Sequence, residues 1–153
     1  MRLYLLRHAH PLAAATHQPD FERELSPSGL RQLPKIAGDI IKRTNSFSNL
    51  VIYSSTARRT RQTVQGVIGN ISGIKVKYLH ELYLPKREQL LDFVNNLSTS
   101  KDILLVGHNP GLSQLASYYS GEQISLSPGD LITLDFSVTH SDGFSKDTAV
   151  IIE

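Results

Sequence analysis

Residues 3–8 read Leu-Tyr-Leu-Leu-Arg-His, an apolar run that passes directly into a guanidinium and an imidazole. A short apolar run of this kind is typical of a buried β-strand. In open α/β sheets, ligands bind outside the carboxyl ends of the parallel strands. The stretch therefore predicts an inner strand that presents Arg7 and His8 at a ligand site.

Three further apolar runs have the same character, and they alternate with longer stretches of helical period. The runs are 50–53, 76–79 and 103–106, and the helical stretches are 30–41, 57–68, 90–97 and 112–119. This alternation is typical of βα units that build a largely parallel sheet. We predict an α/β fold with three αβα layers around a mostly parallel central sheet.

The first helical stretch carries an apolar stripe that we expect to face the sheet. Its members are Leu30, Leu33, Ala37, Ile40 and Ile41. Ser26 and Pro27 are a good pair for the N-cap and the first helical turn. Pro34 interrupts the stripe, and because proline removes a backbone donor we expect a bend or a late start there.

The end of the chain has a different pattern from the rest. Residues 132–136 alternate apolar and polar side chains, and residues 149–152 form another apolar run. Between them, residues 139–143 resemble a turn, so we expect an antiparallel hairpin on the sheet edge. No repeat, linker or long insertion is visible, and we predict a single compact domain over residues 1–153, without a large inserted subdomain.

The composition excludes several kinds of chemistry. The 153 residues include no cysteine, which rules out a disulfide framework, a cysteine-ligated zinc, an iron–sulfur cluster and a thiolate nucleophile. The formal charge of +2 is too small to argue for a nucleic acid or an anionic membrane as partner. We see no apolar run long enough to span a membrane and no secretory leader at the start, and we expect a cytoplasmic protein.

Polar residues collect after three of the predicted strands, whose ends the topology brings to one edge of the sheet. They are Arg7 with His8, Arg59 with its neighbour Arg58, and His108 with Asn109. A guanidinium binds a phosphoryl group through two parallel hydrogen bonds, and an imidazole can attack phosphorus. The chain has no Walker loop, no Gly-x-Gly-x-x-Gly after the first strand, no Gly-x-Ser-x-Gly elbow and no acidic metal cage. A histidine nucleophile without metal or cofactor is the remaining interpretation.

Four segments, in order along the chain, resemble motifs of the histidine phosphatase superfamily, which includes the cofactor-dependent phosphoglycerate mutases. They are 6–9, similar to the Arg-His-Gly signature; 25–30, similar to the start of the first helix; 55–63, similar to Ser-Pro-x-x-Arg-Ala-x-Gln-Thr; and 106–112, similar to the second-histidine motif. The resemblance implies a phosphoglycerate mutase-like fold. The short length and the wording Gly-His-Asn-Pro-Gly-Leu are most similar to SixA-type phosphohistidine phosphatases.

The resemblance also implies a role for each matching residue. His8 is the nucleophile that forms a covalent phosphohistidine, and water then cleaves this intermediate. Arg7, Arg59 and His108 bind the phosphoryl oxygens and stabilise charge in the transition state. An imidazole suits the nucleophile because it is largely unprotonated near neutral pH. We expect a backbone carbonyl to hold its other ring nitrogen.

Three further residues are candidates for the same site. Arg23 resembles an arginine that approaches the phosphate in some relatives, and Asn109 follows the second histidine. Glu81 lies where mutase-like relatives carry the glutamate that protonates the leaving oxygen, although it is also interpretable as a plain surface carboxylate. An imidazole leaving group needs such an acid less than an ester does.

The chain departs from the family pattern at Ala9, His10 and Thr56, none of which removes a catalytic group. His10 has no family role. Ser55 and Thr63 are expected mainly to cap and pack the helix that follows them.

Four functions remain open from the sequence, and the last of them, nucleic-acid binding, rests only on the cluster of Arg58, Arg59 and Arg61. The first is a metal-independent phosphatase of phosphohistidine, acting on histidine-phosphotransfer domains of signalling proteins and releasing inorganic phosphate. The second keeps the chemistry but acts on small phosphate esters or sugar phosphates, for which a deeper pocket and an essential Glu81 are expected. The third is a non-catalytic phosphate-binding module, against which the intact set of site residues argues.

Overall fold

The first strand, β1 (Arg2–Arg7), lies inside the sheet between β4 (Asp102–Gly107) and β5 (Leu131–Asp135). The computed structural model describes residues 1–44, 47–69, 71–98, 101–136 and 144–152. Over these residues the sheet has six strands in the order β3-β2-β4-β1-β5-β6. The remaining strands are β2 (Leu50–Ser55), β3 (Lys75–Leu79) and β6 (Val150–Ile152).

The strand directions confirm the predicted sheet. β1, β4, β2 and β3 pair in parallel, which is the arrangement expected of βα units. β5 pairs antiparallel with β1, and β6 pairs antiparallel with β5 at the edge. The antiparallel pair expected at the end of the chain is therefore confirmed, whereas its predicted turn at 139–143 lies outside the described residues.

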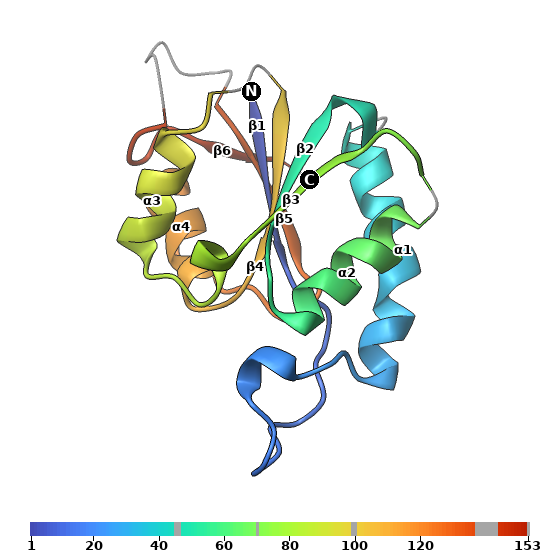
Figure 1. The fold of residues 1–153 in the computed structure, drawn as a ribbon. Helices are drawn as coiled ribbons and strands as arrows, with labels where there is room; N and C mark the ends of the chain where they lie inside the picture. Colours follow the sequence, from blue (N-terminus) through green and yellow to red (C-terminus); the bar gives the residue numbers. More distant parts are fainter. Residues whose placement is uncertain (45–46, 70, 99–100, 137–143, 153) are drawn as a thin grey trace.

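Helices cover both faces of the sheet, as Figure 1 shows. They are α1 (Pro27–Thr44) and α2 (Arg58–Ile68) on one face, and α3 (Arg87–Asn95) and α4 (Gly111–Ser120) on the other. Three short 3₁₀ helices connect the elements: η1 (Asp20–Glu22), η2 (Phe47–Asn49) and η3 (His80–Leu82). The predicted three-layer αβα arrangement is confirmed. Within the described ranges, no helix is long and apolar enough to cross a membrane.

The pleat of the inner strands divides the apolar core in two. Leu3 and Leu5 of β1 pack with α3 and α4, while Tyr4 and Leu6 of the same strand pack with α1 and α2. All four side chains are fully buried, which explains why this strand reads as a continuous apolar run. The end of β1 is therefore fixed in a rigid frame.

The buried face of α1 corrects the predicted stripe. Ile36 is buried with Leu33 and Ile40, but Leu30 is 51% exposed and Ile41 is 45% exposed. Because buried positions on a helix recur at three and four residues, the face through 29, 33, 36 and 40 leaves 30 and 41 one position to the side.

The predicted late start of this helix at Pro34 is also wrong. The helix begins at Pro27 and runs through Pro34. The hydroxyl of Ser26 accepts the backbone N–H of Gly29 at 3.1 Å, which confirms Ser26 as the cap.

Gly29 fits the start of α1 against the segment that follows β1. A Cβ at this position would collide with the carbonyl oxygen of His10, which already accepts the backbone N–H of Ser26 at 2.9 Å. Only a residue without a side chain allows this approach, and it fixes the chain two residues after His8.

We predict that Gly29→Ala lowers the free energy of unfolding by roughly 1–3 kcal/mol, because the methyl group has to displace backbone. The matched control is Gly38→Ala in the same helix, where a Cβ meets no atom within 4 Å. The control should be neutral or up to about 1 kcal/mol more stable, because alanine is the better helix former. Denaturant titration measures both, and equal effects of the two substitutions would contradict this explanation.

Candidate active site

Three segments that are distant in the sequence meet at the carboxyl edge of the sheet. His8 follows β1, Arg59 lies in the first turn of α2, and His108 follows β4. Their exposed fractions are 3%, 2% and 2%, and the two imidazole centroids lie 5.3 Å apart. The structure thus brings together the three residues on which the sequence argument most depends.

Thr63 connects two of these segments. Its hydroxyl donates to the carbonyl of Arg59 at 2.7 Å and accepts the backbone N–H of Ala9 at 3.1 Å. The backbone N–H of His8 also donates to the carbonyl of Gly107 at 3.1 Å, which ties β1 to β4 just below the site. Thr63 therefore does more than pack its helix, because it fixes the position of α2 against the segment that follows β1.

The hydrogen bonds of His8 determine its tautomer. Nδ1 lies 2.8 Å from the carbonyl oxygen of Ala9, and because a carbonyl only accepts, Nδ1 carries the proton. This confirms the expected backbone support. Nε2 is then left with its lone pair, into which the Nε–H of Arg59 donates at 3.2 Å.

His108 has the opposite tautomer. A guanidinium only donates, so the contact of 3.2 Å from Nη2 of Arg59 makes Nδ1 of His108 an acceptor. The proton of the neutral ring then lies on Nε2, which donates to Oγ of Ser55 at 2.9 Å. Ser55 Oγ also accepts the backbone N–H of Ala57 at 3.2 Å. The N-cap of α2 is Ala57, and no side-chain capping bond is made there, so the predicted capping role of Ser55 is wrong and its contact with His108 orients the second histidine.

Burial keeps both imidazoles neutral. Burial first, and then the charges of Arg59, Arg7 and Arg23, lower the pKa of His8 to about 4, although its bond to Ala9 opposes this. Burial first, and then the charge of Arg59, lowers the pKa of His108 to about 2. At neutral pH, His8 therefore presents an unprotonated Nε2, as a nucleophile requires.

Two guanidiniums at the site have donors without a protein partner. Nε of Arg7 and Nε of Arg23 are buried, and no acceptor among the described residues pairs with either. Burial lowers the pKa of Arg7, whose Nη1 donates to the carbonyl of Leu126 at 2.8 Å. Because a buried N–H without an acceptor is costly, each of these donors needs a partner from outside the protein, which a water molecule or an anion supplies.

Asp20 is a site residue that sequence reasoning missed. Its Oδ2 accepts from Nη2 of Arg59 at 3.0 Å and from the hydroxyl of Tyr83 at 2.7 Å, and its Oδ1 pairs with Arg23 at 3.2 Å. Tyr83 also packs its ring edge against His108, with centroids 5.5 Å apart. The one sequence signal was a carboxylate three residues before the candidate Arg23, a spacing that suits a helical turn.

Asn109, predicted to bind phosphate, uses its side chain for the fold. Its amide Nδ2 donates to the carbonyl of Leu126 at 2.8 Å, and its Oδ1 accepts from the hydroxyl of Ser113 at 2.8 Å. Since Arg7 donates to the same carbonyl of Leu126, Asn109 connects the second-histidine segment to the support of Arg7.

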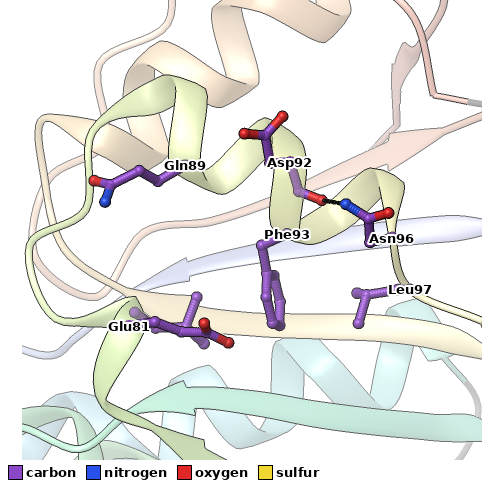
Figure 2. Close-up of a pocket in the computed structure, with 7 residues that line it drawn as sticks. Glu81, Gln89, Asp92, Phe93, Asn96 and Leu97 are labelled. Atoms are coloured by element: carbon purple, nitrogen blue, oxygen red, sulfur yellow. Dashed lines mark hydrogen bonds between the residues drawn. The ribbon is translucent and has the colours of Figure 1, made fainter.

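Glu81, the predicted proton donor, lies in η3 with an exposed side chain. Figure 2 shows it beside α3, in a pocket of about 470 Å³ that Gln89, Asp92 and Phe93 also line. Neither site histidine lines this pocket. Its role as a proton donor therefore stays a prediction without a contact that supports it.

The arrangement is equipped for chemistry on a phosphoryl group. It holds one neutral imidazole with a lone pair, a second imidazole, and a guanidinium that donates to both, while the charges of Arg7 and Arg23 also act on His8. Among the residues that the structure describes, no group of three or more His, Cys, Asp or Glu side chains is arranged to hold a metal ion. Guanidiniums supply the positive charge that a transferring phosphoryl group needs.

The sequence pattern of the histidine phosphatase superfamily (branch 1) matches residues 3–90. An uncharacterized chloroplastic protein of Arabidopsis thaliana is 30% identical to this chain over 138 residues. The match covers 82% of this chain and 62% of the plant protein, so the chain spans less than two thirds of that relative.

Two solved structures are similar to the whole fold. A SixA protein of Agrobacterium tumefaciens, named as a phosphohistidine phosphatase, has 33% sequence identity and a TM-score of 0.79, covering 88% of this chain and 90% of that one. The tungstate complex of the protein histidine phosphatase SixA has 18% identity and a TM-score of 0.72, covering 95% and 97%. The latter similarity concerns the fold alone.

The pKa values of the two histidines predict how the protein responds to acid. Unfolded histidines titrate near pH 6.5, at about their reference pKa. Since the folded pKa values are about 4 for His8 and about 2 for His108, the unfolded state binds more protons below pH 6.5. The free energy of unfolding should therefore be fully maintained above that pH and decline as the pH falls towards 4.

NMR titration of the imidazole ¹³C and ¹⁵N shifts checks this directly, with free imidazole in the same tube as reference. Neither ring should show a midpoint between about pH 5 and pH 8, and Nε2 of His8 should stay unprotonated there. A midpoint near that of free imidazole for His8 would contradict the geometry.

Proposed function

The chain belongs to the histidine phosphatase superfamily (branch 1), and we propose that it is a metal-independent phosphatase that dephosphorylates phosphohistidine on proteins. One observation carries the proposal. His8 is a buried neutral imidazole whose Nε2 lone pair accepts from Arg59, and the charges of Arg7 and Arg23, each with an unpartnered Nε–H, act on the same ring and lower its pKa. A nucleophile and an anion site thus coincide.

The reaction has two displacement steps at phosphorus. In the first, Nε2 of His8 forms a bond to phosphorus while the bond from phosphorus to the substrate imidazole breaks, and the released imidazole takes a proton from water. In the second, water attacks phosphorus, the bond to Nε2 breaks, and inorganic phosphate leaves while one proton of the water passes to solvent. His8 then has its lone pair again.

The guanidiniums hold the phosphoryl oxygens through both steps. Nε of Arg7 and Nε of Arg23 donate without giving up a protein partner. Arg59 has to release Nε2 of His8 before the attack, and its N–H groups then face the phosphoryl oxygens. Preorganised donors of this kind typically contribute roughly 3 kcal/mol each to the transition state.

Two findings support phosphohistidine over a phosphate ester. The similarity at 33% identity is to a SixA protein named as a phosphohistidine phosphatase. An ester needs a proton donor for its leaving oxygen, whereas the candidate Glu81 lines a pocket apart from both histidines. The proposed substrates are histidine-phosphotransfer domains of signalling proteins, and the proposed location of the protein is the cytoplasm.

The proposal predicts a covalent phosphoenzyme on His8. The protein is mixed with a radiolabelled phosphohistidine protein, quenched in alkali and separated on a denaturing gel. Label should appear on the wild-type chain and on His17→Ala, a control that removes an exposed histidine, and should be absent from His8→Ala. Turnover should fall by more than about a thousandfold in His8→Ala.

A panel of small phosphate esters run beside the phosphohistidine protein tests the substrate. Rapid turnover of esters with none of phosphohistidine would refute the substrate, and normal activity of His8→Ala would refute the mechanism. Binding of phosphate without any turnover would instead identify a non-catalytic module.

A further inference from the structure

The guanidinium of Arg59 is almost fully engaged with protein groups. Its Nη1 donates to the backbone carbonyl of Asp20 at 2.7 Å, and its Nη2 donates to the carboxylate of the same residue at 3.0 Å. With the bonds to His8 and His108, four hydrogen bonds are made by a group that has five N–H donors. The fork that should hold a phosphoryl group is therefore occupied by Asp20.

The carboxylate of Asp20 is held as a bound anion would be. Arg59 and Tyr83 donate to one oxygen, and Arg23 pairs with the other. Carboxylates and phosphoryl groups both accept from a guanidinium fork in the same bidentate manner. Asp20 is not the sole partner of the Arg59 guanidinium, which also donates to both histidines.

The location of Asp20 allows it to leave this position. It lies in η1, in a stretch where residues 12–20 are exposed, and its own side chain is 42% exposed. The base of the loop is pinned where Pro11 pairs with the core residue Leu25, whereas no residue of η1 itself is buried and Phe21 packs edge-on against Tyr83. Figure 1 shows this loop extending from the sheet edge beside α1.

Asp20 is ionised at neutral pH. Partial burial alone would raise its pKa, but the hydroxyl of Tyr83 and the charges of Arg59 and Arg23 outweigh burial and lower the pKa below its ordinary value. The negative charge is therefore present whenever a substrate arrives.

We propose that Asp20 is a specificity-determining residue that competes for the phosphoryl site. Its carboxylate accepts from Nη2 of Arg59 in the free protein, and an incoming phosphoryl group displaces it from that donor. A singly charged ligand, such as an acidic side chain of another protein, gains little binding free energy when it replaces a carboxylate that is already tethered there. A doubly charged phosphoryl group gains more, because it also pairs with Arg7 and Arg23. The inference rests on the proposed function, which assigns this fork to phosphate.

Calorimetric titration with inorganic phosphate tests the competition. Asp20→Asn removes the charge, and phosphate should bind at least about tenfold more tightly, as expected for loss of a charged hydrogen-bonded competitor. Acetate, a singly charged probe, should change from no detectable binding to measurable binding. Glu22→Gln is the matched control, because it removes the same charge from the same 3₁₀ helix and should stay within twofold of wild type.

Tyr83→Phe provides a second variant if Asp20→Asn unfolds. It keeps the carboxylate but removes one of its donors, so phosphate should bind more tightly by a smaller factor. Unchanged or weaker phosphate binding in these variants would overturn the competition and show that Asp20 positions the guanidiniums. An equal gain in Glu22→Gln would also overturn it. If neither wild type nor any variant binds phosphate, the proposed function fails together with this inference.

Discussion

The guanidinium of Arg59 is the group on which the site depends. It is 2% exposed and donates to Nε2 of His8, to Nδ1 of His108 and to Asp20. A buried charge without a partner is strongly destabilising, so the carboxylate of Asp20 and the two imidazole lone pairs stabilise this cation in the free protein. Burial, assisted by the charge of this cation, lowers the pKa of both imidazoles and keeps them neutral. One side chain therefore sets the geometry of the site and contributes to its protonation state.

The sheet order explains why three separate segments can share that group. β1 and β4 are neighbours at the centre, so the histidines that follow them are adjacent, and α2 enters from the end of β2, the next strand. Thr63 and Gly29 then fix α2 and α1 against the residues that follow His8. The rigid core holds His8 and His108, whereas Asp20 belongs to an exposed loop. In our proposal, this difference lets the loop supply an exchangeable anion while the strand end supplies the nucleophile.

Much of this arrangement was predictable from the sequence. Buried parallel strands are continuous apolar runs, and the residues after them, such as His8 and His108, are recognised from their position alone. Asp20 and Tyr83 were not, because they reach the site from irregular segments whose folding no periodicity describes. Leu30 and Ile41 were assigned to the wrong face because a helical stripe read from sequence is uncertain by one position. Glu81 shows a further limit: its place in the sequence fits a proton donor, but the direction of its side chain is set by packing beside α3.

We infer that a single planar guanidinium organises His8, His108 and the proposed anion site. Arg59→Lys tests this inference most directly, because lysine keeps the charge but lacks the fork that reaches three partners. The measurement is the rate of phosphoenzyme formation in a single turnover, by rapid quench, on protein whose fold is verified by circular dichroism. The account predicts a fall of roughly a hundredfold or more. A rate within about threefold of wild type would contradict it, since charge alone would then suffice.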